Sequence, residues 1–373
     1  MTLPSQPRMY REIYQQPEAL QAALDRYLDA EGFRLDASLP VQRLLEAKPA
    51  EIVIAASGSS RHAGMVAELL LEDFSGLPVD VEYASEYCCR AEHTLKHALV
   101  LVLSQSGETA DTLAALRKAA AAGHPTLAIT NVAGSTMARE AAASFPTEAG
   151  IERAVPATKS FTAQLLNVFL LALLAARARD TLTPAEIRTH LAAARRIPDS
   201  IRTQLPRWEA AIQTIAASYT SAASFLFLGR GVHYPVAREG ALKLKESAYL
   251  HAEGYPSGEL RHGPNALVSD TIPLVMIATA DPRDPGSLDR YNRVLHLMAT
   301  MRRQGANILA IANTGDTEVP ALATHTVFVD PTLDALLPIC EVVPLQLFAY
   351  FMARARGIDV DHPRNLTKAV LGE

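Results

Sequence analysis

The stretch ALVLVLSQSGETADTLAALRKAAAAG, residues 98–123, predicts a buried strand that leads directly into a helix. Its first part, Ala98–Ser104, is almost entirely apolar, as expected for a strand covered on both faces of a parallel sheet. Alanine and leucine then recur at helical spacing, and the pattern ends at Gly123, a residue type that often terminates helices. Four hydroxyl side chains crowd the junction between strand and helix: Ser104, Ser106, Thr109 and Thr112.

Apolar strand patterns also occur on either side of this stretch. The segment Ala50–Ser57 precedes a helix that we expect to begin at Ala63, and Pro125–Asn131 precedes a shorter helical pattern. Strands that alternate with helices favour an α/β fold, with a parallel sheet between two layers of helices. The most apolar helix pattern, Leu165–Ala176, is too short to cross a bilayer and predicts a core helix.

The same order of patterns recurs in the second half of the chain. Three pairs of segments correspond: Glu51–Gly58 with Ser224–Gly231, Tyr83–Tyr87 with Pro256–Leu260, and Gly123–Asn131 with Gly305–Asn313. The first two pairs are offset by 173 residues and the third by 182. A repeat of this length predicts two copies of one α/β domain rather than a solenoid.

We expect five segments along the chain. A helical N-terminal segment, with a helix from about Pro17 to Ala30, precedes the first domain. A polar helical connector around Asp180–Ser200 separates the two domains, and a tail follows the second domain. The expected bounds of the five segments are 1–34, 35–180, 181–204, 205–356 and 357–373.

The composition is typical of a soluble globular enzyme, with 49% hydrophobic residues, 20% charged residues and a net charge of −5. Acidic and basic residues are interspersed, which argues against a nucleic-acid partner. The cysteines, Cys88, Cys89 and Cys340, show no metal-binding spacing, and the N-terminal residues contain no export signal. We therefore expect a protein of the reducing cytoplasm.

Hydroxyl-rich turns follow two of the predicted strands, at Ser57–Ser60 and at Ser104–Thr109. In open α/β sheets, ligands bind beyond the carboxyl ends of the strands, and each turn would also open a helix. Hydroxyls, free backbone N–H groups and the positive helix end together favour a phosphate group. Neither turn has the lysine of a triphosphate loop or the glycines of a dinucleotide site, so a phosphate monoester is the expected ligand. The alternative, that these hydroxyls only cap helices, stays open on the sequence alone.

The second copy lacks this serine cluster and carries charged residues instead. In EGALKLKE, the side chains of Glu239, Lys243 and Glu246 share one helical face, whereas Lys245 points elsewhere. A carboxylate beside an amine suits proton transfer next to a carbonyl, and His262 suits the opening of a sugar ring. The alternative is a solvated helix face with surface ion pairs.

Two further features are ambiguous on the residues alone. Lys368 is either a solvent lysine or, if it folds into a site, a group that forms a Schiff base with a sugar carbonyl. His251, Glu253 and His262 match no standard metal spacing, and we expect no metal there.

Six segments closely resemble, in the same order, the isomerase half of glucosamine-6-phosphate synthase and its relatives, the sugar-isomerase (SIS) domain proteins. They are SQSGETADT, TKSFTAQL, FLGRG, EGALKLKE, HAEGYPSGELRHGP and DHPRNLTK. The resemblance begins at Arg11 and continues almost to Glu373. It implies two tandem SIS domains, each a flavodoxin-like sandwich of a parallel sheet between helices, and no metal or organic cofactor.

The resemblance also implies a set of substrate-binding residues. The sugar phosphate would be held by polar side chains of the first domain: Ser60, Ser104, Gln105, Ser106 and Thr109. Val155 and Ala157 would line the sugar, and Arg364 would order the tail. The expected ligand is therefore an amino-sugar phosphate.

The catalytic roles follow from the same resemblance. Glu246 would move a proton between C1 and C2, and Lys243 would assist it. His262 would open the sugar ring from the neighbouring subunit, which implies an obligate homodimer. Lys368 would form an imine with a ketose phosphate.

The chain departs from the synthases in three places. No counterpart of their glutaminase domain precedes Arg11, Ala157 replaces a serine, and Thr367 replaces the alanine before the tail lysine. We therefore expect a glucosamine-6-phosphate deaminase that releases fructose 6-phosphate and ammonia. The alternatives are a synthase half that uses free ammonia or a separate glutaminase, a deglycase of another amino-sugar phosphate, and a non-catalytic sugar-phosphate sensor.

Overall fold

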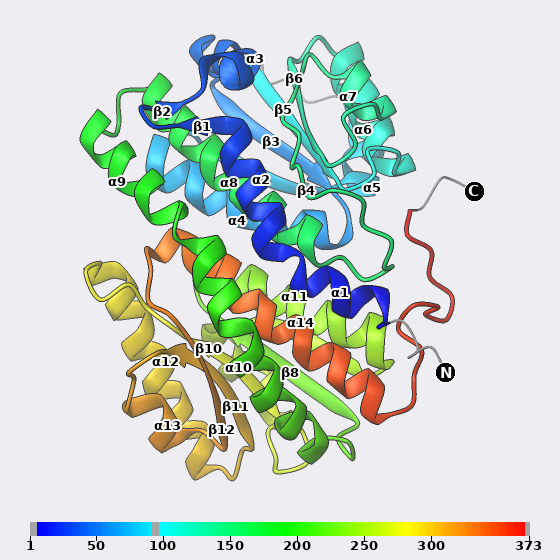
Figure 1. The fold of residues 1–373 in the computed structure, drawn as a ribbon, viewed down its shortest axis with the longest axis vertical. Helices are drawn as coiled ribbons and strands as arrows, with labels where there is room; N and C mark the ends of the chain where they lie inside the picture. The colour runs from blue at the N-terminus through cyan, green and yellow to red at the C-terminus, as the bar shows by residue number, and fades with distance from the viewer. Residues whose placement is uncertain (1–5, 92–96, 370–373) are drawn as a thin grey trace. The chain divides into compact units, whose positions relative to one another are not determined.

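The structure, a computed structural model, describes residues 6–91 and 97–369. The first five residues of the expected N-terminal segment and the last four of the expected tail lie outside these ranges. The chain, traced in Figure 1, divides into two compact units, each assembled from separate stretches. The first unit contains Gln16–Glu152, Lys159–Pro198 and Thr367–Glu373, and the second unit contains Met1–Gln15, Arg153–Thr158 and Asp199–Leu366.

The first unit holds a five-stranded parallel sheet and a separate two-stranded antiparallel ribbon formed by β1 and β2. Its helices and strands, in chain order, are α2 (Gln16–Tyr27), β1 (Leu28–Asp29), β2 (Gly32–Phe33), α3 (Leu35–Glu46), β3 (Glu51–Ala56), α4 (Gly58–Ser75), β4 (Val79–Tyr83), α5 (Ala84–Cys89), β5 (Ala98–Ser104), α6 (Ala110–Ala121), β6 (Thr126–Thr130), α7 (Thr136–Glu140), β7 (Ala143–Ser144), α8 (Lys159–Ala178) and α9 (Pro184–Ala194).

The strand order of this sheet is β4-β3-β5-β6-β7, and every neighbouring pair is parallel. Counted from its first strand, the order is 2-1-3-4-5, as in flavodoxin-like folds. The strand β5 is buried along its whole length and pairs with β3 from Glu51↔Ala98 to Ala56↔Leu103. Because the strand order reverses between β3 and β5, the turns after these strands flank the crevice where such sheets bind ligands.

Alternate residues of the strands face two different helical layers. Val53, Val100 and Val102 belong to a core shared with α5 and α6. On the other face, α4 packs so closely that a Cβ at Gly64 would lie 3.0 Å from Ile54 Cγ2. The helix α8 packs against α4 and is buried from Lys159 to Ala176, so it forms the centre of this layer.

The second unit contains a second five-stranded parallel sheet. Its elements, in chain order, are α1 (Arg8–Tyr14), α10 (Ile197–Ser218, which begins in the first unit), β8 (Ser224–Gly229), α11 (His233–Ala248), β9 (His251–Pro256), the 3₁₀ helices η1 (Ser257–His262) and η2 (Pro264–Leu267), β10 (Leu274–Ala278), α12 (Pro285–Arg303), β11 (Ile308–Asn313), α13 (Glu318–Leu322), β12 (His325–Val329), η3 (Asp334–Leu336) and α14 (Leu337–Ala355).

The strand order of the second sheet is β12-β11-β10-β8-β9, again with all pairs parallel. With β8 in the place of β3 and β10 in the place of β5, this is the topology of the first unit. Leu226 and Met276 pack with α12 and α13 on one face. Phe225 packs on Phe348 of α14 on the other face, with ring centroids 5.8 Å apart. These observations confirm the predicted α/β class and the duplication.

Several helices differ from the sequence predictions. The helix expected from about Pro17 to Ala30 is α2, which ends at Tyr27, and a further helix, α1, precedes it. The helix after β3 begins at Gly58 rather than Ala63. The core pattern 165–176 is only part of α8, which has 20 residues. By length and composition, α8 and the segment Asp334–Ala355 could each cross a membrane, but 89% and 100% of their apolar windows are buried within the protein. Burial of this extent is typical of core helices, so neither is strong evidence of a membrane span.

Candidate active site

The hydroxyl groups after β5 lie together in the first unit. Ser104 Oγ is 2.9 Å from Thr109 Oγ1 and 3.5 Å from Ser106 Oγ. The backbone N–H of Gly107 donates to Ser104 Oγ over 3.2 Å. Gln105 is half-buried in the same turn. The turn therefore gathers three hydroxyls at the carboxyl end of a buried strand, where an α/β sheet binds its ligand.

Gly107 is required for this arrangement. Its φ is +66°, a left-handed conformation that favours glycine. A Cβ at this position would lie 2.1 Å from Ser135 Oγ and 2.8 Å from Thr130 Oγ1. The turn therefore packs directly against the end of β6 and the start of α7, which fixes the positions of its hydroxyls.

The alternative that these hydroxyls serve as ordinary helix caps is wrong at two positions. Ser57 and Thr109 occupy the N-cap positions of α4 and α6, yet neither side chain forms a capping hydrogen bond. The first-turn N–H groups of both helices are therefore not satisfied by these side chains and remain suited to an anion. Ser60 differs, because its Oγ accepts a hydrogen bond of 3.0 Å from Gln164 Nε2 on α8.

The charged face predicted for EGALKLKE is present on α11, in the second unit. Lys243 Nζ lies 3.3 Å from Glu239 Oε1 and 2.6 Å from Glu246 Oε2. The side chains of Lys243 and Glu239 are fully buried, whereas 20% of the Glu246 side chain is exposed. The alternative of a solvated helix face is therefore wrong, although Lys245 is exposed as expected.

Electrostatics keep this buried lysine charged. Burial alone would lower the pKa of Lys243, but the Glu239 and Glu246 carboxylates outweigh that effect and raise the pKa above its usual value. The helix can approach the sheet here because residue 240 is glycine: a Cβ would lie 2.9 Å from both Phe227 Cε1 and Leu345 Cδ1. The cluster is thus held on a helix packed tightly between β8 and α14.

A buried histidine anchors the N-terminus of α11. His233 Nδ1 lies 2.9 Å from Glu341 Oε1, and Nε2 lies 3.7 Å from Asp334 Oδ1. Burial would lower the pKa of His233, but the two carboxylates raise it to about 10, so the ring is charged at neutral pH. Thr279, just after β10, donates a hydrogen bond to Glu341 and thereby ties α14 to the sheet.

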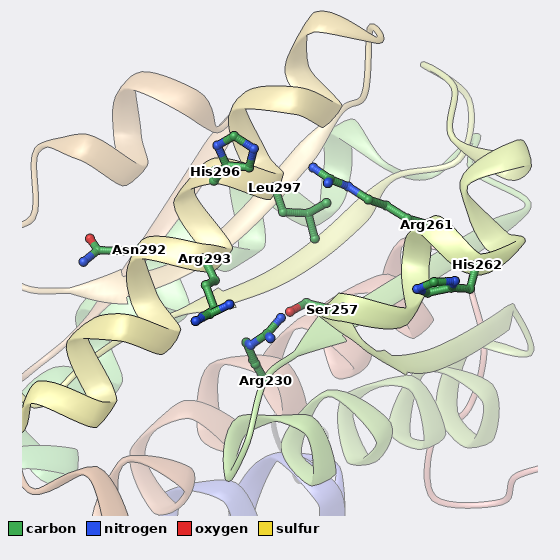
Figure 2. Close-up of a pocket in the computed structure, with 9 residues that line it drawn as sticks. Arg230, Ser257, Arg261, His262, Asn292, Arg293, His296 and Leu297 are labelled. Carbon is green, nitrogen blue, oxygen red and sulfur yellow. The ribbon is translucent and has the colours of Figure 1, made fainter.

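His262 lies at the end of η1 in the second unit and is exposed. It lines a cavity whose other described residues come from the ends of β8 and β9, from η1 and from α12, and not from α11 (Figure 2). Within the described parts of the chain, no group of three or more His, Cys, Asp or Glu residues is placed to hold a metal ion.

The loop expected to line the sugar is anchored by an acidic residue of α1. Glu12 accepts hydrogen bonds from the backbone N–H groups of Arg153, over 2.6 Å, and Ala154, over 3.0 Å. Val155 and Ala157 are half-buried, as lining residues would be. Their alternation with the buried residues Ala154, Pro156 and Thr158 gives the loop one face toward the protein and one away from it.

The tail is attached to the end of α11. The backbone N–H of Arg364 donates to the Tyr249 hydroxyl over 2.6 Å. The Arg364 guanidinium carbon lies 4.7 Å from the centroid of the Tyr249 ring, at cation–π distance. Tyr249 caps α11 in a left-handed conformation, with φ of 54°.

Lys368 has a partner that sequence reasoning missed. Its Nζ contacts Glu152 Oε2, and the Glu152 side chain is completely buried. Glu152 also accepts hydrogen bonds from Ser160 N, over 3.1 Å, and from Ser160 Oγ, over 2.6 Å. No pattern in the sequence distinguishes Glu152, between Ile151 and Arg153, from a solvated acidic residue. Its position just before the expected sugar-lining loop is the only signal that points to it.

Comparison with known sequences identifies the relatives of this chain. A family model described as SIS domain matches residues 44–174 and again residues 218–355. The chain is 41% identical over 368 residues to glutamine–fructose-6-phosphate aminotransferase (isomerizing) of Chlorobaculum tepidum. The match covers 98% of this chain and 58% of that protein, so the chain spans little more than half the length of its relative.

Solved structures agree with the sequence matches. The C-terminal domain of glucosamine-fructose-6-phosphate aminotransferase from Francisella tularensis is 34% identical, with a TM-score of 0.88 over 97% of this chain and 100% of that chain. Glucosamine-6-phosphate deaminase from Thermotoga maritima is 22% identical, with a TM-score of 0.71 over 97% and 99% of the two chains, and shows a shared fold alone. With two matched segments, each containing all five strands of one parallel sheet, the chain belongs to the SIS domain family and carries the domain twice.

Proposed function

We propose that this protein is a glucosamine-6-phosphate deaminase, which converts glucosamine 6-phosphate and water to fructose 6-phosphate and ammonia. The names of the relatives describe enzymes that act on sugar phosphates. We assign the steps of such a reaction to residues of this chain. The observation that carries it is the buried cluster of Glu239, Lys243 and Glu246. A carboxylate held in this way is suited to move a proton between neighbouring carbon atoms.

Glu246 performs the proton transfer. It takes the C2 proton of the open-chain amino aldose while the carbonyl oxygen at C1 gains a proton, which gives an enolamine. The same carboxyl then returns its proton to C1 while the amino nitrogen loses one, which leaves an imine at C2. Glu246 is the partly exposed member of the cluster, whereas Lys243 is enclosed and assists by holding the carboxylate in place.

Lys368 releases the nitrogen. Its Nζ adds to C2, ammonia leaves as the old C2–N bond breaks, and water hydrolyses the lysine imine to the ketose. An attacking amine must be neutral, and the Glu152 carboxylate in contact with Nζ is suited to accept its proton. Glu152 therefore acts as a positioning residue for Lys368, and Ser160 holds Glu152 in turn.

The remaining assignments concern binding. Polar side chains of the first unit hold the phosphate group: Ser60, Ser104, Gln105, Ser106 and Thr109. Val155 and Ala157 line the sugar, and Arg364 orders the tail. His262 opens the sugar ring of a substrate bound by a second copy of the chain, so the active form is a homodimer.

The experiment is a measurement of ammonia and fructose 6-phosphate formed by the purified protein from glucosamine 6-phosphate. We expect equal amounts of both products, since the reaction is favourable when free ammonia is scarce. The variant Glu246→Gln is the negative control. A folded protein that binds the sugar phosphate and releases no ammonia would overturn the proposal.

A second candidate is the synthetic direction with free ammonia. It is favoured by the 41% identity to an aminotransferase over almost the whole chain. The same groups would act in reverse, because both directions pass through the same intermediates and transition states. Incubation of fructose 6-phosphate with an ammonium salt would then yield glucosamine 6-phosphate. At cellular ammonia concentrations, the rate of this synthesis would exceed the rate of deamination.

A further inference from the structure

The cavity shown in Figure 2 has a volume of about 510 Å³ and lies within the second unit. Its basic lining comes from three segments that follow strands of the sheet. Arg230 follows β8, Arg261 belongs to η1 after β9, and Arg293 and His296 lie on α12 after β10. The cavity therefore lies between the middle of α12 and the segments after β8 and β9, at the carboxyl ends of two strands. Ligands of α/β domains bind near such strand ends.

The residues that line the cavity carry a net positive charge. The described lining residues include three arginines and two histidines but no aspartate or glutamate. The Asp289 carboxylate attracts Arg293 as well as Arg230, which lowers the pKa of Asp289. Arg293 Nε pairs with Asp289 at 2.7 Å, but Asp289 is exposed and is not one of the described lining residues. Like charges that converge in this way repel one another unless an anion lies between them.

Figure 2 shows how these groups are directed. The guanidinium groups of Arg230 and Arg293 point toward the Ser257 hydroxyl, while Arg261 reaches from η1 toward Leu297. Ser257 is buried in the protein and lines the cavity. Two sets of donors thus face the cavity from different sides, and guanidinium groups match the geometry of phosphate oxygens.

The domain duplication supplies an independent argument. Arg230 occupies the position that corresponds to Ser57 in the first copy, directly before the matched glycines Gly58 and Gly231. The turn after β10 corresponds to the serine turn after β5. It contains an ion pair between Arg283 and Asp281. The second copy therefore has cationic groups after its strands where the first copy has hydroxyl groups.

We propose that this cavity is a binding site for a small anion with more than one phosphate group, such as a metabolite that carries a diphosphate. A single phosphate would fill only part of this volume. All the described lining residues belong to the second unit, and the proposal does not depend on the proposed deaminase activity. His262 lines the cavity as well, but the assignment rests on the arginines.

The test is calorimetric titration of the whole protein with pyrophosphate at low ionic strength, with inorganic phosphate for comparison. We expect one site per chain in the second unit, with tighter binding of pyrophosphate than of phosphate. Arg293→Ala and Arg230→Ala should each weaken this binding by about tenfold or more, because each removes charge-assisted hydrogen bonds. Arg293→Lys should restore part of the affinity.

Two controls identify the site. Arg302→Ala removes the same charge from an exposed position of α12 outside the described lining and should leave the affinity unchanged. The double variant Ser104→Ala with Thr109→Ala should also bind pyrophosphate as the wild type does. Binding that is lost in this double variant but kept in Arg293→Ala would overturn the proposal, as would the absence of any pyrophosphate binding. Thermal unfolding of each variant checks that it is folded.

Discussion

The Lys368 ammonium pairs with the carboxylate of Glu152, which also accepts two hydrogen bonds from Ser160 at the start of α8. The Glu152 side chain is completely buried, whereas 23% of the Lys368 side chain is exposed. Removal of one partner from a buried ion pair leaves an uncompensated charge, which is costly. The contact therefore holds the tail lysine at one place in the first unit.

Glu152→Gln should slow the reaction of Lys368 while leaving sugar-phosphate affinity nearly unchanged. Glutamine keeps the shape and an acceptor for Ser160 N, but it cannot accept a proton from Nζ. We expect the rate of borohydride trapping with fructose 6-phosphate to fall by about tenfold or more. The deficit should be smaller at high pH, where hydroxide can accept the proton in place of Glu152.

Two controls accompany this variant. Lys368→Ala should abolish trapping altogether. Glu148→Gln removes the charge of an acidic residue that pairs with Arg26, and it should leave the trapping rate unchanged. If Glu152→Gln traps the ketose at the wild-type rate over the whole pH range, Glu152 has only a structural role.

Glu246→Gln should reduce kcat by roughly 10²- to 10⁴-fold, the usual contribution of a general acid–base group. The affinity for glucosamine 6-phosphate should change little, because the amide has the same size and can still accept a hydrogen bond from Lys243. Exchange of the C2 hydrogen with deuterium from solvent, followed by NMR, measures the step directly. Lys245→Gln, on the exposed side of the same helix, is the matched control, and retained exchange in Glu246→Gln would assign the base elsewhere.

Ser104→Ala combined with Thr109→Ala should weaken the binding of phosphorylated sugars and leave the binding of unphosphorylated sugars unchanged. A hydrogen bond to a charged group contributes about 1.5–3 kcal/mol, so the double variant should bind glucosamine 6-phosphate at least roughly tenfold more weakly. Binding of unphosphorylated glucosamine should not change. Thr189→Ala, in an exposed position of α9, serves as the control, and equal losses for both sugars would contradict the phosphate assignment.

His233→Gln should alter how stability depends on pH. The folded-state pKa of His233 is raised from 6.5 to about 10 by Glu341 and Asp334, despite the opposing effect of burial. Between these two pKa values the folded protein keeps the His233 proton, whereas the unfolded chain releases it. The stabilisation that the charged His233 provides is therefore complete below about pH 6.5 and is lost as the pH rises toward 10.

Chemical denaturation at several pH values measures this effect. The difference in unfolding free energy between wild type and His233→Gln should shrink as the pH rises from 6.5 to 10. A difference that stays constant across that window would show that His233 is not charged in the folded protein.

Much of the fold could be predicted because it depends on local patterns. The strand expected at Ala98–Ser104 is present with those bounds, since a continuous apolar run between polar turns has few other solutions. Helix ends were less accurate: α4 begins at Gly58 rather than Ala63, because polar residues in a first turn carry no apolar periodicity. For the same reason, the apolar periodicity did not predict α1 or the full length of α8.

The sequence by itself determined the α/β class, the duplication, the hydroxyl turn after β5 and the common face of Glu239, Lys243 and Glu246, because strand and helix periods are local properties. Only the tertiary structure decided that Lys243 is fully buried and that Lys368 pairs with Glu152, 216 residues away. Burial and long-range ion pairs depend on which surfaces pack together. A charged residue in a sequence has the same appearance whether packing encloses it or leaves it in water.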